Sequence, residues 1–171
     1  MNTWDALTSR RNVRQFDDRP IDGEDLDAIL EAGRRSPSSK NWQPWDFVVV
    51  TDRDQLAEMA ADWTGTGHVA GSAAAVALVA SVPRDQHERH RTHYDLGQAT
   101  MAMMVAAADR GIGSGHAAVT NQERMAAILG LPDGKEVIYL LDFGYPADRP
   151  LQPIKRPNRR SFDEVVHRGR W

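Results

Sequence analysis

The stretch Thr92–Arg110, THYDLGQATMAMMVAAADR, forms the clearest helical pattern in the chain. Four apolar residues recur at the spacing of one helix face: Leu96, Ala99, Met103 and Ala106. Between positions 99 and 108, small and Met side chains also occupy the other sides, so we expect burial around most of the circumference. Gly111 follows as the residue that ends the helix. The pattern predicts a central helix on which the other elements pack.

Shorter patterns on both sides of this segment predict the remaining elements. Helices are expected over residues 4–8, 22–35, 54–63 and 121–130, and strands over 47–51, 73–82 and 136–144. The alanine-rich segment 73–82 is also compatible with a helix. No repeat or linker divides the chain, so we expect one domain over residues 1–171, with an α+β or α/β layered fold.

Composition and the two ends of the chain narrow the class of protein. The 171 residues are 41% hydrophobic and 26% charged, which is typical of a folded soluble domain and not of a disordered chain. The longest apolar run, 73–82, is about half of the ~20 residues that span a bilayer. No signal peptide is visible, so we expect a cytoplasmic protein without a membrane partner. With no cysteine, disulfides and thiolate ligands are excluded.

The net charge of −3 hides two basic ends. Residues 10–19 hold four Arg against two Asp, and residues 149–171 hold seven Lys or Arg against two acids. Either cluster alone is typical of a solvated surface. Together they suit one phosphate between the ends of the chain, because Arg makes fixed bidentate contacts. The overall acidity disfavours nucleic acid as a partner. The Pro-rich segment after residue 146 needs a surface to lie on, in its own domain or on a partner subunit.

Three segments carry groups that suit a ligand: RRNVRQF at 10–16, SPSSKNWQPW at 36–45 and GIGSGHAA at 111–118. The second segment suits a planar ligand, although an ordered loop that satisfies its own backbone has the same composition. In the third, glycines let the backbone approach a ligand and present N–H groups. His116 alone is more typical of a structural histidine than of a catalyst.

The sequence contains no obvious nucleophile or acid–base pair, so a cofactor would carry the chemistry of an enzyme. His87, His90 and His93 lie in an expected exposed loop and lack an acidic partner. We therefore expect no metal site.

The segments, in this order and spacing, resemble the nitroreductase family of FMN-dependent oxidoreductases. Residues 10–16 look like the family's Arg-Arg-Ser-Val-Arg-x-Phe start, and residues 36–45 look like its Pro-Ser-x-x-Asn-x-Gln-Pro-Trp motif. Further landmarks are matched at residues 111–114, 129–132, 143–146 and 159–166. The resemblance runs from about residue 3 to residue 167.

The resemblance implies an α+β sandwich: a mixed central β-sheet flanked by helices, in an intertwined homodimer with two FMN sites at its interface. Residues 146–171 would be a C-terminal extension that packs on the partner subunit. The positions assigned to FMN are Arg10, Arg11, Asn12, Arg14, Pro37, Ser38, Ser39, Asn41, His116, Ala117, Ala118, Arg159 and Arg160.

Each group of these positions has an implied role. Arg10, Arg11, Asn12 and Arg14 would hold the phosphate, the ribityl chain and the ring edge, and Arg159 and Arg160 would join them at the phosphate. Residues 37–41 would come from the partner subunit. The backbone of residues 116–118 would face the ring around N5. His68 is the best candidate for a further polar contact to the ring, and residues 84–94 would cover the pocket.

The resemblance also implies a reaction. NADH or NADPH would deliver hydride to flavin N5, and an electron-poor small molecule such as a nitro compound or quinone would then take it in a ping-pong cycle. No protein residue is expected to be catalytic, because the flavin carries the chemistry. A flavin-binding carrier or sensor without turnover, and a different flavin reaction, stay open as alternatives.

Overall fold

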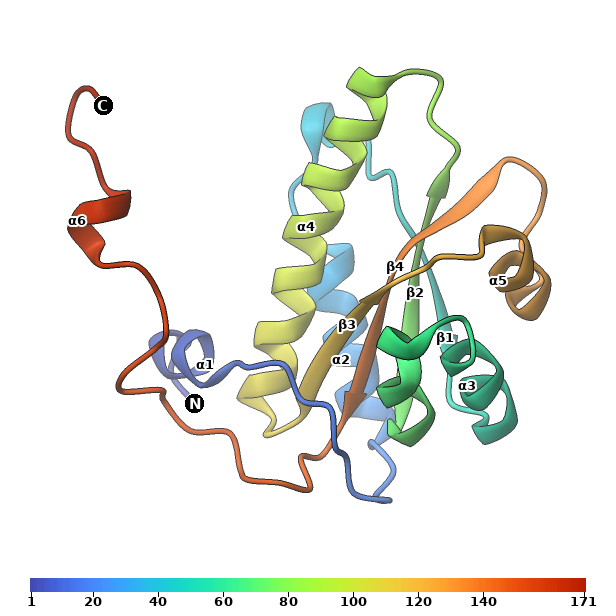
Figure 1. Ribbon diagram of the computed structural model, residues 1–171, viewed down its shortest axis with the longest axis horizontal. Helices are drawn as coiled ribbons and strands as arrows, with labels where there is room; N and C mark the ends of the chain where they lie inside the picture. The colour runs from blue at the N-terminus through green and yellow to red at the C-terminus, as the bar shows by residue number, and fades with distance from the viewer.

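The fold is organised around a four-stranded sheet in the order β1-β2-β4-β3 (Figure 1). The computed structural model describes all residues 1–171. The strands are β1 (Asp46–Val50), β2 (Ala74–Ser81), β3 (Gly113–Ala118) and β4 (Lys135–Gly144). All three strand pairs are antiparallel: β1 with β2, β2 with β4, and β4 with β3. The expected mixed sheet is therefore wrong for this chain, in which the one parallel pairing is an isolated bridge from Asn12 to Ser114.

Helices cover both faces of the sheet, as expected for an α+β protein (Figure 1). They are α1 (Thr3–Ser9), α2 (Gly23–Arg34), α3 (Arg53–Ala60), α4 (Gln86–Asp109), α5 (Gln122–Leu129) and α6 (Phe162–Val165), with short 3-10 turns η1 (Ser39–Asn41) and η2 (Thr64–Gly71). One core cluster joins α2 and α4 to the sheet, and a second joins α3, η2 and α5 to the opposite face.

The central helix is α4, and three of the four residues expected on its face, Leu96, Ala99 and Met103, belong to the first core cluster. Gly111 adopts the left-handed conformation just after it, with φ of 71°. The helix begins earlier than expected, because the Asp85 side chain accepts a hydrogen bond from the Glu88 amide at 2.7 Å. The segment expected to form an exposed loop and to cover the pocket is therefore largely helical.

Within the glycine-rich segment, Gly111 lies in the turn after α4 and Gly113–Ala118 form strand β3. Its glycines make room for protein groups. A Cβ on Gly113 would lie 2.6 Å from Cγ2 of Val13, and a Cβ on Gly115 would lie 2.8 Å from the carbonyl oxygen of Val13. The absence of side chains therefore lets the N-terminal segment lie directly on β3.

The C-terminal segment leaves the body of the molecule. It runs past α1, where the Ile154 amide donates to the Thr8 carbonyl at 3.0 Å, and ends in the isolated α6 (Figure 1). Every residue from Gln152 to Trp171 is exposed. No helix of the chain is both long and apolar enough to span a membrane.

Candidate functional site

The N-terminal basic segment is attached firmly to the sheet. Val13 is fully buried, and its amide donates to the Ser114 carbonyl at 2.9 Å. Phe16 forms an isolated bridge with Pro146. Residues 12 and 13 are therefore held against β3 and residue 16 against the chain that follows β4, which fixes the backbone from which Arg11 and Arg14 project.

The three arginines differ in what they contact. Arg11 donates to Asp148 Oδ1 at 2.6 Å and to the Arg149 carbonyl at 2.8 Å, and this guanidinium lowers the pKa of Asp148. Arg14 Nη1 lies 2.6 Å from Nε2 of His68. Arg10 has no ion pair or side-chain hydrogen bond, and the Nε atoms of Arg10 and Arg11 are buried without an acceptor.

Unsatisfied buried N–H groups are rare in folded proteins. Guanidinium donors that lack a protein acceptor suit an anion with several oxygens, such as a phosphate. The donor set of the N-terminal segment therefore fits the phosphate end of FMN.

The loop that contains Pro37, Ser38, Ser39 and Asn41 is strained and well supported. Lys40, Asn41 and Gln43 have φ between 50° and 56°, in the left-handed region that non-glycine residues rarely adopt. Each such residue costs of order 1–3 kcal/mol and persists only where its surroundings hold it. The Gln43 amide donates to Ser38 Oγ at 2.9 Å.

Asp95 anchors this loop to α4, and sequence reasoning missed it. Its buried carboxylate accepts from the Ser39 amide at 3.0 and 3.2 Å. A single carboxylate inside the apolar pattern of the central helix is the signal that marks it, since a buried charge requires donors.

Within one chain the loop and the arginine segment are separated. The loop contacts the first half of α4 through Asp95, whereas the arginine segment lies on β3, which follows the end of that helix. The 14 residues from Asp95 to the end of α4 at Asp109 extend about 21 Å along the helix axis. Figure 1 shows η1 near one end of α4 and the chain after α1 near the other.

Residues 116–118 form the second half of β3. The His116 ring lies edge-on to Tyr139, with centroids 6.4 Å apart, and lines a cavity of about 230 Å³ between α4 and the sheet. Ala117 is buried, and the Ala118 carbonyl accepts from Nε1 of Trp63 at 2.9 Å.

The second basic cluster stands apart from the first. Arg159 and Arg160 are exposed in the C-terminal segment, and the only side-chain hydrogen bond of either is from Arg159 to the neighbouring Asn158 carbonyl, at 2.7 Å. The single chain does not bring them to Arg10.

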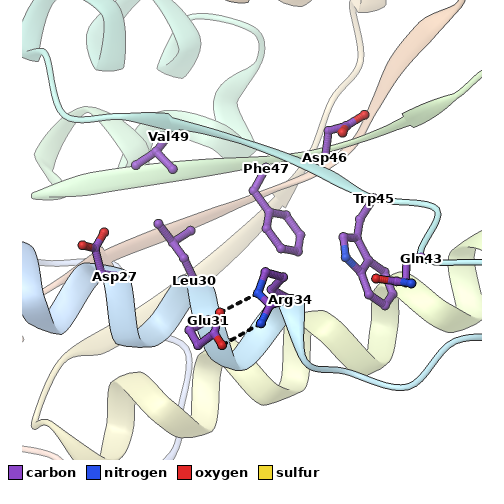
Figure 2. Close-up of a pocket in the computed structure, with 9 residues that line it drawn as sticks. All are labelled: Asp27, Leu30, Glu31, Arg34, Gln43, Trp45, Asp46, Phe47 and Val49. Carbon is purple, nitrogen blue, oxygen red and sulfur yellow. Dashed lines mark hydrogen bonds and ion pairs between the residues drawn. The ribbon is translucent and has the colours of Figure 1, made fainter. Parts of the chain in front are cut away.

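A separate groove lies between α2 and β1 (Figure 2). Its volume is about 740 Å³, and its apolar side chains are Leu30, Trp45, Phe47 and Val49. Polar residues also line it, among them the Glu31–Arg34 ion pair; Arg34 and Arg35 lower the pKa of Glu31 to about 2. The groove contains none of the residues that the sequence assigns to the site. It lies along β1, an edge strand of the sheet.

No three His, Asp or Glu side chains gather in a way that could hold a metal ion. His87, His90 and His93 lie on the first turns of α4, not in the loop expected for them.

The fold and these segments can be compared with known proteins. A model of the Nitroreductase family matches residues 7–66 and 60–145. A relative from Archaeoglobus fulgidus, named as a candidate NADH dehydrogenase/NAD(P)H nitroreductase, is 32% identical over 96% of each chain. A 5,6-dimethylbenzimidazole synthase from Rhodospirillum rubrum is 28% identical over 89% of this chain and 86% of its own.

Solved structures show the same architecture. An FMN-dependent nitroreductase from Clostridium difficile R20291 superposes with a TM-score of 0.83 over 97% of this chain and 98% of its own, at 23% identity. At that identity the superposition supports the fold alone. The family match and the 32% identical relative establish membership, and the chain belongs to the nitroreductase family.

Proposed function

We propose that the protein is an FMN-dependent NAD(P)H oxidoreductase that passes hydride to an electron-poor acceptor in a ping-pong cycle. The observation that carries the proposal is the N-terminal segment, whose backbone is bonded to β3 at Val13 and in which the Nε donors of Arg10 and Arg11 have no protein acceptor. The names of the relatives agree with a flavin and a nicotinamide donor. When bound, FMN would supply the hydride chemistry at N5.

The chain's own residues would bind and orient the cofactor. Arg10 and Arg11 would hold the phosphate, Asn12 the ribityl chain, and Arg14 the pyrimidine edge of the ring. Charge-assisted hydrogen bonds of this kind contribute about 1.5–3 kcal/mol each. The backbone of residues 116–118 would line the ring near N5.

The rest of the site would come from a second copy of the chain. The strained loop with Pro37, Ser38, Ser39 and Asn41 lies too far along α4 to meet the arginines of its own chain, so the partner's loop would complete the site. The exposed C-terminal segment would pack on the partner and bring Arg159 and Arg160 to the phosphate. Its apolar residues Ile154, Phe162, Val165 and Trp171 are exposed in the single chain, which favours such a contact.

The visible spectrum of the purified protein tests the proposal. We expect a yellow dimer that releases about one FMN per subunit on denaturation. NADH or NADPH should bleach the spectrum, and a quinone or nitroaromatic should restore it. A colourless protein that does not take up added FMN contradicts the proposal, and a flavin that no nicotinamide reduces indicates a carrier or sensor instead.

A different flavin reaction is the second candidate, favoured by the likeness to the 5,6-dimethylbenzimidazole synthase. Incubation with reduced FMN and oxygen separates the two. An oxidoreductase returns the FMN intact through many cycles, whereas an enzyme that consumes the flavin depletes it.

A further inference from the structure

The proposed function leaves one buried charge unused. Asp142 on β4 is 0% exposed and lies between the fully buried Leu141 and Phe143. Its cross-strand neighbours, Ala75 on β2 and Gly115 on β3, are both small. A Cβ on Gly115 would lie 2.8 Å from both carboxylate oxygens. The two flanking strands therefore leave a space that the carboxylate fills, and a charge in such a place needs a partner.

The partner is His68, in η2. Its side chain is 6% exposed, and Nδ1 lies 2.7 Å from Oδ2 of Asp142. Its other nitrogen, Nε2, lies 2.6 Å from Nη1 of Arg14. The three side chains therefore form one chain of hydrogen bonds that starts in the core and ends on the N-terminal segment.

The direction of the hydrogen bonds follows from the chemistry of the groups. A guanidinium only donates, so Nε2 of His68 must accept from Arg14. The proton of a neutral imidazole then sits on Nδ1, where it is donated to Asp142. A second proton on Nε2 would face the Arg14 N–H and break the contact. The geometry assigns the neutral Nδ1–H tautomer to His68.

The charges of the group depend on one another. No Lys or Arg forms an ion pair with Asp142, and its second oxygen, Oδ1, is buried without a hydrogen-bond partner. The positive charge nearest along the hydrogen-bond chain is that of Arg14. The Asp142 carboxylate is therefore stabilised by the positive charge of Arg14, to which His68 connects it. The same hydrogen bonds hold the Arg14 guanidinium in one orientation.

We propose that Asp142 and His68 are positioning residues, which hold the Arg14 guanidinium in place and let the Asp142 charge weaken the positive field of Arg14. This inference rests on the proposed function, because Arg14 is there assigned to the pyrimidine edge of FMN. Reduction adds negative charge to that edge, so the buried carboxylate should lower the midpoint potential of the bound flavin.

The first experiment needs no cofactor. Nitrogen-15 NMR of the FMN-free protein, with His68 assigned by comparison with His68→Gln, reports which ring nitrogen carries the proton. We expect Nδ1 protonated and Nε2 unprotonated. An Nε2–H tautomer, or a doubly protonated ring in the folded protein at neutral pH, overturns the relay.

The second experiment measures the charge effect. Asp142→Asn keeps an oxygen that can accept from Nδ1–H and removes the charge. We expect the ratio of affinities for reduced over oxidised FMN to rise about tenfold, equivalent to a potential about 30 mV more positive for a two-electron couple. Asp133→Asn, at an exposed site on the loop before β4, is the matched control and should leave the potential unchanged. An Asp142→Asn potential equal to the control's contradicts the proposal.

A pair of His68 variants separates positioning from general packing. Gln can donate to Asp142 and accept from Arg14, whereas Leu can do neither. We expect His68→Gln to keep FMN affinity close to that of the wild type, and His68→Leu to lose about tenfold. Equal losses in both overturn the positioning role. If Asp142→Asn does not fold, the wild-type tautomer and this pair still decide the proposal. A protein that never binds FMN refutes the proposed function and the redox effect together, while the tautomer still decides whether the relay exists.

Discussion

The two arginine-rich ends of the chain have similar composition but opposite structural settings. The N-terminal cluster lies on β3, with Val13 fully buried and with Arg11 and Arg14 bonded to other residues of the chain. Arg159 and Arg160 of the C-terminal cluster are exposed, and the only side-chain hydrogen bond of either goes to the neighbouring Asn158 carbonyl. The same residue type is thus preorganised at one end and unsupported at the other. The difference indicates that one half of the proposed phosphate site is built by the single chain, and that the other half requires a second copy.

Removing the C-terminal segment, which would supply the second half of the proposed phosphate site, should have the largest effect. Deletion of residues 153–171 leaves both core clusters intact, since neither contains a residue of that segment. We expect a folded chain that loses FMN binding and dimerises poorly, measured by circular dichroism, flavin titration and analytical ultracentrifugation. The double variant Arg159→Gln with Arg160→Gln is the control: it should weaken FMN binding and keep the dimer. A truncated chain that remains a yellow dimer would remove the C-terminal segment from the site.

A substitution of Arg10 tests the half of the proposed phosphate site that the single chain builds. We expect Arg10→Ala to weaken FMN binding by about 1.5–3 kcal/mol, roughly ten- to a hundredfold. The FMN-free variant should unfold at the wild-type urea concentration or above, because Arg10 makes no side-chain bond within the chain and its buried Nε has no acceptor. Isothermal titration and urea unfolding measure the two quantities. Equal loss of stability and of affinity would mean that Arg10 serves the fold and not a ligand.

Gly115→Ala should weaken the contact between the N-terminal segment and β3, so that the N-terminal cluster becomes less fixed, as the C-terminal cluster already is. The added Cβ would meet the Asp142 carboxylate and the Val13 carbonyl, both at 2.8 Å. We expect a loss of about 1–3 kcal/mol in the free energy of unfolding. Gly23→Ala, where a Cβ meets nothing within 4 Å, is the matched control and should be neutral or stabilising. Urea titrations of both variants measure the effect, and similar midpoints would show that β3 can move away from the segment.

The smallest effect concerns the ion pair that joins the N-terminal segment to the start of the C-terminal one. Arg11 holds the pKa of Asp148 below its ordinary value of 3.8. At pH values above 3.8 the ion pair therefore stabilises the contact between the two segments. This stabilisation is lost as the pH falls through the lowered pKa of Asp148. We expect increased backbone motion near Arg149 in acid, and the same change at neutral pH in Asp148→Asn. Amide NMR relaxation measures it, and an unchanged Asp148→Asn would show that the Arg11 contact to the Arg149 carbonyl suffices.

Local signals predicted the elements of the fold well. The helices expected from residues 22 and 121 begin directly after those residues, Gly111 ends the central helix, and the three expected strands all occur in the structure. The start of α4 was expected too late, because the His- and Arg-rich turns after Asp85 lack apolar periodicity although the cap is present. The mixed sheet came from the family resemblance, and strand direction within one chain does not follow from periodicity.

The site residues could be predicted only where several polar or charged residues follow one another in the sequence. The arginine segment and the 36–45 loop were identified as polar runs. A second reason for the glycines near Gly113 could not be seen in the sequence, because the protein groups that approach them belong to distant parts of the chain. Asp95 and Asp142 were missed, since each is a single carboxylate inside an apolar element and its donors come from loops. FMN contacts of the assigned residues stay a prediction.

The seating of Val13 on β3 also has a consequence for the order of assembly. About one hundred residues separate the two pairing partners, Val13 and Ser114, in the sequence. During synthesis the basic segment leaves the ribosome long before the strand that receives it, and closing such a long loop is slow. We therefore expect the segment to stay unattached until β3 and β4 have paired, so that cofactor uptake is one of the last events in the maturation of the protein.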